Sequence, residues 1–288
     1  LIDCLRDLLA QDHRPLEILV VDQSAKPDPG ASQLAAENAE KIFYHCVDFR
    51  GLPKARNYGW QHAKYDAIVY VDDDVRCGPA LISQFLRCLN EPGVGVVGGG
   101  IDQENKPPDG RQPIGRFNLW LAEPPRGFSA QSELDVDGVK GCSFATLRNA
   151  AEASGGFDEG LDLGAALYEE LEFCLRVKHQ GYRVRFNGRA RLRHMAAADG
   201  GCRVEVVPDY VRGLAHNRGV LIRRHTRLYH WPTALLRVAQ LAVAYALHYR
   251  RPACLVSWLP GLLAGLRDGG KPPLCTYFRS VQADKAEA

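Results

Sequence analysis

Three consecutive acids, Asp72, Asp73 and Asp74, close a short apolar run that begins at residue 67. Alternate residues of a strand point to the same face, so Asp72 and Asp74 are expected to project together from the carboxyl edge of a sheet. Ligands bind at that edge in open α/β sheets. Neighbouring carboxylates repel one another unless a cation offsets their charge, and hard oxygen ligands suit Mg²⁺ or Mn²⁺. The pattern indicates a divalent metal site, with a helix cap or a solvated turn as the structural alternative.

A second group of acids, Glu169, Glu170 and Glu172, opens a helical pattern. Helical spacing places Glu169 and Glu172 on one face and turns Glu170 about 100° away. A carboxylate close to a metal and diphosphate site can act as a general base toward an acceptor hydroxyl. The alternative is an acidic first turn that the helix dipole favours.

Two further polar residues end expected strands. Asp22 closes the run at 16–22 and is suited to accept hydrogen bonds from a base or a ribose. His194 follows ARLR, where a neutral imidazole can complete a metal shell. Each is a single residue, so an ordinary polar side chain at a strand end remains the alternative.

The elements that must position these side chains alternate between strands and helices. Apolar runs and turn residues predict strands at 16–22, 67–74, 94–102 and from 182, and helices at 54–64, 80–90 and 168–180. This alternation predicts an α/β fold with a mainly parallel sheet flanked by helices. After Pro208 the chain is expected to be helical, with amphipathic stripes and interspersed Arg over residues 234–267.

The composition fits an ordinary globular domain with an appendage: 288 residues, of which 46% are hydrophobic and 24% charged. Nine cysteines without C-x-x-C spacing suggest neither a zinc site nor a disulfide framework, and a reducing cytosol is the simplest location. The sequence shows no signal-peptide pattern and no apolar run long enough to span a bilayer. We therefore expect a cytoplasmic protein, and we hypothesise that its C-terminal amphipathic helices contact the inner membrane face peripherally.

The order of these motifs resembles family 2 glycosyltransferases of the GT-A fold, a Rossmann-like fold that uses nucleotide-diphospho-sugars. The motifs are LEILVVDQS, GLPKARNYGW, AIVYVDDDV, GGFDEGLDLG, YEELEFCLRVKHQGYRV and ARLRH. The resemblance covers residues 1–225 and looks closest to bacterial rhamnosyltransferase-like enzymes of cell-surface polysaccharide synthesis, including HNRGVLIRRH at 216–225.

The resemblance implies an inverting, metal-dependent transfer of a sugar from a nucleotide diphosphate to a hydroxyl group. It implies that Glu170 is the catalytic base and that Asp72, Asp74 and His194 bind Mg²⁺ or Mn²⁺. Donor contacts are expected from Asp22, Arg56, Asn57, Asp72 and Asp73, and acceptor contacts from Glu169 and Glu172. The expected partners are a nucleotide-diphosphate sugar and a glycan, lipid-linked or other hydroxyl acceptor, without nucleic acid.

The sequence departs from the family pattern at two points. Glu stands where the family has Asp in the later acidic segment, and a side chain longer by one methylene can displace the reacting atom by about 1 Å. The family's first strand is expected upstream of Leu1, so the GT-A domain at 1–225 is interpreted as incomplete at its N-terminus. A helical appendage is predicted at 226–275 and a disordered tail at 276–288.

Other functions remain open at this point. Paired carboxylates also occur in glycoside hydrolases, which need neither a nucleotide nor a metal. An incomplete nucleotide pocket would fit a non-catalytic binding or scaffold protein. A dinucleotide-dependent oxidoreductase is disfavoured because GVGVVGGG at 93–100 is not followed by a helix with the phosphate-binding glycine spacing.

Overall fold

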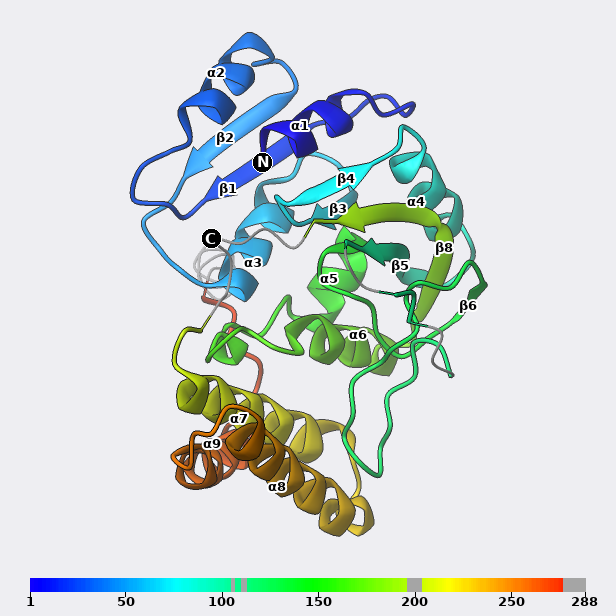
Figure 1. Ribbon diagram of the computed structural model, residues 1–288. Helices are drawn as coiled ribbons and strands as arrows, with labels where there is room; N and C mark the ends of the chain where they lie inside the picture. The colour runs from blue at the N-terminus through cyan, green and yellow to red at the C-terminus, as the bar shows by residue number, and fades with distance from the viewer. Residues whose placement is uncertain (105–106, 110–112, 196–203, 277–288) are drawn as a thin grey trace, which may run out of the picture.

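Strands and helices alternate along the first two thirds of the chain, and the last third is helical (Figure 1). The computed structural model describes residues 1–104, 107–109, 113–195 and 204–276. Within them the strands are β1 (Ile18–Asp22), β2 (Ile42–Cys46), β3 (Ala67–Val71), β4 (Val75–Cys77), β5 (Val94–Gln103), β6 (Glu133–Asp135), β7 (Ser143–Leu147) and β8 (Arg183–His194). The α-helices are α1 (Ile2–Leu9), α2 (Pro29–Glu37), α3 (Leu52–His62), α4 (Leu81–Leu89), α5 (Arg148–Ser154), α6 (Glu169–His179), α7 (Val207–His225), α8 (Trp231–His248) and α9 (Cys254–Asp268), and the 3₁₀ turns are η1 (Glu159–Leu161) and η2 (Leu228–His230).

The strands form two sheets. β1 and β2 make a parallel pair, and the larger sheet has the order β3-β7-β5-β8-β4, with β6 also paired to β8. In the larger sheet β5–β8 is the parallel pair, and the other pairs between described strands are antiparallel. The predicted α/β class is confirmed, but the predicted mainly parallel sheet is wrong: the sheet is mixed. β3 and β5 do run in the same direction, and β7 lies between them in the opposite direction.

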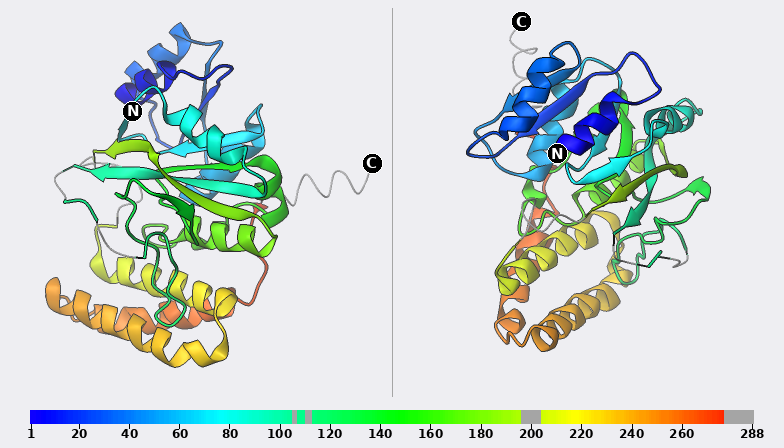
Figure 2. Two further views of the ribbon diagram at one scale, coloured as in Figure 1. Left: turned by 90° about the vertical axis from the view of Figure 1, so that its right-hand side faces the viewer. Right: turned by 45° about the horizontal axis from the view of Figure 1, so that its top comes forward.

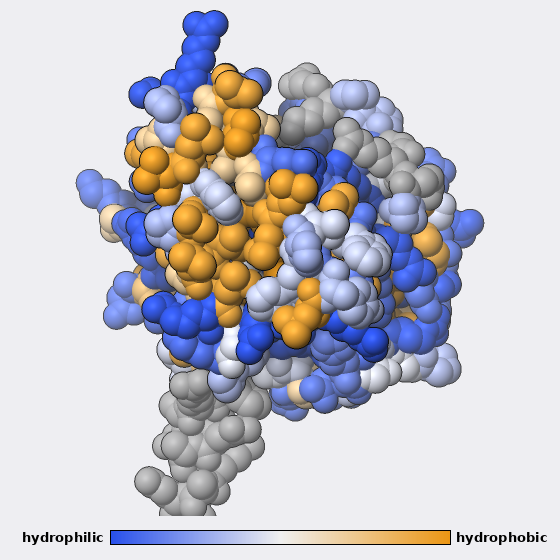
Figure 3. Space-filling view, turned by 90° about the horizontal axis from the view of Figure 1, so that it is seen from below, coloured by the Kyte–Doolittle hydropathy of each residue, from blue (hydrophilic) through white to orange (hydrophobic). Residues whose placement is uncertain are grey.

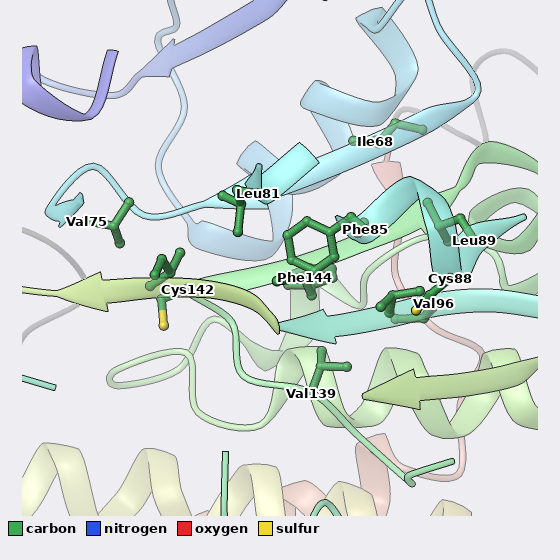
Figure 4. Close-up of a cluster of buried hydrophobic side chains, with 14 of the residues drawn as sticks. Ile68, Val75, Leu81, Phe85, Cys88, Leu89, Val96, Val139, Cys142 and Phe144 are labelled. Carbon is green, nitrogen blue, oxygen red and sulfur yellow. The ribbon is translucent and has the colours of Figure 1, made fainter. Parts of the chain in front are cut away.

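Helices cover both faces of the larger sheet. α4 packs against β5 and β8, while α5 and α6 lie on the other side, between the sheet and the C-terminal helices (Figures 1 and 2). Figure 4 shows Phe85 of α4 directly against Phe144 of β7, and both side chains are fully buried. Burial of such a side chain contributes about 1.5–3 kcal/mol, so this contact anchors α4 to the sheet.

The C-terminal helices α7, α8 and α9 form a separate layer (Figure 2). α7 and α9 approach so closely that a Cβ atom added at Gly261 or Gly265 of α9 would overlap a backbone carbonyl oxygen of α7, that of Arg212 or His216 respectively. Glycine is required there because any side chain would push the two backbones apart. None of the described helices is both long enough and apolar enough to cross a membrane.

Two buried carboxylates attach α6 to its neighbours on both sides. Glu169 forms a buried ion pair with Arg56 of α3. Glu172 is fully buried and accepts from Arg176 Nε at 2.8 Å and from Arg224 of α7 at 2.9 Å. Burial alone would raise the pKa of Glu172, but the charge of Arg176 and the hydrogen bonds outweigh it and hold the pKa well below its ordinary 4.5.

The α7–α9 contact predicts that Gly265→Ala destabilises the protein. The new methyl group would meet backbone that cannot move aside without separating the helices, so we expect the free energy of unfolding to fall by about 3 kcal/mol. Gly59→Ala in α3 is the control, because the nearest atom to its added Cβ is 3.9 Å away on Tyr70. It should be neutral or stabilise by up to about 1 kcal/mol. Chemical denaturation measures both, and equal changes would contradict the packing argument.

The ion pairs of α6 predict that Glu172→Gln costs about 3 kcal/mol of stability at pH 7, because the buried Arg176 guanidinium loses its carboxylate partner and Arg224 keeps only its ion pair with Asp158. The pKa of Glu172 is lower in the folded protein than in the unfolded chain. The native protein is therefore more stable than this variant above about pH 4.5, and the difference in the free energy of unfolding disappears as the pH falls through the folded pKa. Denaturation of both proteins at neutral and acidic pH measures this convergence. The exposed Glu152→Gln should change stability by less than about 0.5 kcal/mol, and a pH-independent gap for Glu172→Gln would contradict the assignment.

Candidate active site

The three consecutive acids lie in the turn between β3 and β4, and not within a strand, because β3 ends at Val71. β4 pairs with the end of β8, where Val75 is the register partner of His194. The backbone oxygen of Asp74 also accepts a hydrogen bond from the Met195 amide at 2.9 Å. Main-chain pairing therefore brings the turn against the end of β8.

This pairing gathers Asp72, Asp74 and His194 into one cluster. Their candidate ligand atoms all lie within 4.8 Å of one another. His194 Nε2 is 3.2 Å from Asp74 Oδ1 and 3.8 Å from Asp72 Oδ2. Asp73 is exposed and lies outside the cluster. The cluster has the composition and spacing of a divalent cation site.

The electrostatics of the cluster disfavour two bare carboxylates. Burial raises the pKa of Asp72, and its neighbours Asp74 and Asp73 raise it further, while Arg56 and His194 lower it. A bound cation would offset both the cost of burying the charged Asp72 carboxylate and its repulsion by the neighbouring carboxylates. The cluster is thus arranged so that added positive charge stabilises it.

His194 is held in place by strands on both sides. Its register partners are Val75 of β4 and Gln103 of β5, and its carbonyl oxygen accepts from the Glu104 amide at 3.0 Å. Nε2 faces the two aspartates. Within the described residues, the buried Nδ1 atom has no hydrogen-bond partner.

Glu170 differs from Glu169 and Glu172, whose carboxylates are engaged in buried ion pairs. It is half-buried and has neither a hydrogen bond nor an ion pair with the part of the chain that the structure describes. Burial, together with the charges of Asp72 and Glu170, raises the pKa of the Cys142 thiol to about 12. This thiol therefore lies within electrostatic range of both acids.

Glu169 and Glu172, the two residues from which acceptor contacts are expected, lie in the interior of the protein. Both carboxylates are buried in ion pairs, Glu169 with Arg56 and Glu172 with Arg176 and Arg224. A carboxylate engaged in this way stabilises the position of its helix and does not present itself to a ligand.

Arg56 is likewise interior. It is 5% exposed, donates to the Gly141 carbonyl oxygen at 3.0 Å, and stacks near the rings of Phe144 and Phe157. Its charge lowers the pKa of Asp72. The structure thus shows Arg56 as a buried cation that pairs with Glu169 and acts electrostatically on Asp72.

Asn57, next on α3, is 1% exposed and makes four hydrogen bonds within the protein. Its Nδ2 donates to Phe157 O at 2.8 Å and to Glu159 Oε1 at 3.0 Å, while its Oδ1 accepts from Trp60 and from the Phe157 amide. Every polar atom of its side chain is engaged, so Asn57 positions α3 against η1 and does not itself offer a group to a nucleotide.

A cavity of about 560 Å³ opens beside this part of α3. It is lined by Cys46, Val47, Asp48, Phe49, Lys54, Asn57, Tyr58, Glu159 and Thr276. Sequence reasoning missed most of these residues, although Lys54 and Tyr58 are four residues apart and hence on one helical face. The volume is in the range of small-molecule sites.

Asp22 ends β1 next to this cavity, because its carbonyl oxygen accepts from the amide of Val47 at 2.9 Å. Its carboxylate accepts from Tyr44 at 2.6 Å and from the Ser24 amide at 2.7 Å. Burial would raise the pKa of Asp22, but these hydrogen bonds outweigh it and lower the value. Asp22 is thus an oriented, charged acceptor at the edge of the smaller sheet.

Solved structures share this fold at low sequence identity. Mannosyltransferase PcManGT from Pyrobaculum calidifontis, in complex with GDP-Man and Mn²⁺, is 19% identical, with a TM-score of 0.55 over 98% of this chain and 74% of that chain. GalNAc-T7 with UDP, GalNAc and Mn²⁺ is 16% identical, with a TM-score of 0.55 over 94% of this chain and 55% of that chain. TarS residues 1–349 from S. aureus, in complex with UDP-GlcNAc, are 13% identical, with a TM-score of 0.53 over 92% of this chain and 87% of that chain.

These likenesses confirm the predicted GT-A fold with its C-terminal helices. No curated protein sequence matches the chain. A family model, however, matches residues 1–154, which is more than half of the chain, and its description is Glycosyl transferase family 2. The acidic cluster and the helix that carries Glu170 agree with this match. The chain belongs to glycosyl transferase family 2 and is a glycosyltransferase that uses a nucleotide-sugar donor.

Proposed function

We propose that this enzyme transfers a sugar with inversion from a nucleotide diphosphate to a hydroxyl group of its acceptor, with the help of Mg²⁺ or Mn²⁺. The observation that carries the proposal is the convergence of Asp72, Asp74 and His194 into one cluster. Two carboxylates and an imidazole can hold a metal ion, and Glu170, which has no ion pair among the described residues, can supply a base.

The cluster fits a divalent cation by its donor set and by its charge. Asp72, Asp74 and Nε2 of His194 would hold the ion, which supplies positive charge against the departing diphosphate. Mg²⁺ prefers oxygen ligands throughout, so the imidazole favours Mn²⁺. Two of the similar solved structures, PcManGT and GalNAc-T7, contain Mn²⁺.

The donor would lie along the first turns of α3. Asp22 and the neighbouring cavity would bind the nucleoside, and the diphosphate would reach the cluster, with the exposed Asp73 assisting. Arg56 and Asn57, the latter at the wall of the cavity, would act by fixing α3. Lys54, which lines the cavity, adds a positive charge on the path of the diphosphate.

In the transfer step, Glu170 takes the proton of the acceptor hydroxyl as its oxygen attacks the anomeric carbon. The new glycosidic bond forms while the bond from that carbon to the phosphate oxygen breaks, and the nucleoside diphosphate leaves with the electron pair. Attack opposite the leaving group inverts the anomeric centre, so no protein nucleophile is required. The half-buried position of Glu170 keeps its carboxylate accessible to an acceptor.

Substrate and pathway are part of the same proposal. We infer transfer of a hexosyl or rhamnosyl group to a glycan or lipid-linked acceptor in cell-surface glycan or polysaccharide synthesis. GDP-Man and UDP-GlcNAc, bound by PcManGT and TarS respectively, are the first donors to test. We further propose that residues 1–225 make up the catalytic domain and residues 226–275 an appendage. Apart from Thr276, the proposed tail at 276–288 lies outside the described residues.

We expect calorimetry to detect Mn²⁺-dependent binding of one nucleotide from a panel of nucleoside diphosphates and their sugars. Asp74→Ala and His194→Ala should each weaken this binding by about 10–100-fold, because a metal site loses at least that much when its coordination is disturbed. Asp73→Ala is the matched control in the same turn and should weaken binding by less than about tenfold, or 1.4 kcal/mol. Equal losses at Asp73 and Asp74 would contradict the site, and no nucleotide binding at all would favour a scaffold function.

We expect Glu170→Gln to bind the donor normally and to lose transfer by about 10²–10⁴-fold, because the amide cannot take a proton. The measurement is release of nucleoside diphosphate in the presence of an acceptor panel, next to the donor Kd. Glu170→Asp keeps the carboxylate but shifts it by about 1 Å, so its loss should be smaller than that of the Gln variant. Full transfer activity in Glu170→Gln would remove this residue from the base role.

A further inference from the structure

Large apolar side chains are exposed along the outer sides of α8 and α9. The outward stripe of α8 contains Leu236, Val243 and Leu247, and that of α9 contains Val256, Leu259 and Leu263. Leu247 is 74% exposed and Val256 is 73% exposed, which is unusual for aliphatic side chains in water. Figure 3 shows hydrophobic residues gathered on this underside of the molecule and bordered by hydrophilic ones. We call these six residues the α8–α9 face.

α8 carries its small side chains inward and large ones outward. Its buried stripe consists of Ala234, Val238, Ala242 and Ala246, whereas α9 turns Gly261 and Gly265 toward α7 and also buries Leu262. A helix on the surface of a water-soluble domain normally buries its largest apolar residues. The reversed arrangement indicates that the outer side of this layer has an apolar surrounding of its own.

The same segment is strongly basic. Residues 226–276 contain six Arg or Lys and a single acid, Asp268. Arg250 and Arg251 are both exposed in the turn that joins α8 to α9, beside the exposed Tyr249. Apolar residues bordered by cations, with an aromatic side chain between them, match the interface of a bilayer that carries negative charge.

We propose that the α8–α9 face binds the surface of an anionic lipid bilayer, with its six aliphatic side chains among the acyl chains and Arg250 and Arg251 at the headgroups. Charge distinguishes this occupant from a second copy of the chain. A symmetric dimer through this face would bring two basic segments together, whereas anionic headgroups would neutralise them. The inference does not depend on the catalytic assignment and goes beyond it.

Flotation of the full-length chain with vesicles tests the proposal. Vesicles of phosphatidylcholine with added phosphatidylglycerol should bind the protein, vesicles of phosphatidylcholine alone should bind it less, and added salt should weaken the difference. The double variant Arg250→Gln/Arg251→Gln should lose about fivefold in affinity for the anionic vesicles per Arg removed. Its binding to phosphatidylcholine alone should be unchanged.

The apolar part of the face is tested by Leu247→Glu/Val256→Glu, which should lose binding to both kinds of vesicle. Phe43→Glu is the matched control: Phe43 is 40% exposed on β2, at the opposite end of the molecule, and its change should leave vesicle binding intact. Unchanged thermal unfolding and donor binding would show that each variant is folded. If the two glutamates disturb folding, the Arg250→Gln/Arg251→Gln variant still tests the proposal, because both arginines lie in an exposed turn.

Two results would overturn the proposal. One is a wild-type chain that floats with neither kind of vesicle, or that floats equally well with all variants. The other is a concentration-dependent dimer in light scattering that Leu247→Glu/Val256→Glu dissociates, which would assign the face to a second copy of the chain. Loss of flotation without loss of Mn²⁺-dependent donor binding would support the lipid surface and leave the catalytic proposal untouched.

Discussion

Two buried carboxylates on the first turn of α6 orient the part of the molecule on which the chemistry depends. Glu169 is paired with Arg56 of α3 on one side, and Glu172 with Arg224 of α7 on the other. A buried charge that loses its partner costs several kcal/mol, so α6 cannot rotate about its axis without a large penalty. Glu170 lies between the two in sequence and points about 100° away from Glu169. Its direction is therefore set by these two buried ion pairs.

The acidic cluster is held by a different kind of force. The turn at Asp72–Asp74 is tied to β8 by main-chain hydrogen bonds, and His194 is fixed by strands on both sides. The orientation of Glu170 thus depends on charged side chains, and the position of the cluster depends on backbone pairing. Arg56 links the two, because its charge acts on Asp72 while its ion pair holds α6. A change at this guanidinium would disturb both halves of the site together.

Much of this arrangement could be predicted from sequence, and the gaps have physical reasons. Asp72, Asp74 and His194 end or follow apolar runs, and strand ends at one sheet edge meet, so their convergence was predictable. The short strands β2, β4, β6 and β7 were missed, and with the last three the antiparallel pairs of the larger sheet. The roles of Glu169 and Glu172 depend on arginines far away in the chain, which helical spacing cannot reveal. The spacing did correctly separate Glu170 from the other two.

The glycine contact between α7 and α9 has a mechanical meaning for the whole molecule. Two backbones that touch directly have no side chains between them that can rearrange, so the helices cannot slide past each other by small rotamer changes. The α7–α9 pair should therefore move as one rigid unit, to which α6 is attached through the Glu172–Arg224 ion pair. When the outer side of α9 rests on a surface, this unit would keep Glu170 at a fixed distance from that surface. Under the proposed mechanism, acceptor hydroxyl groups presented at that distance would be selected over identical groups held nearer or farther away.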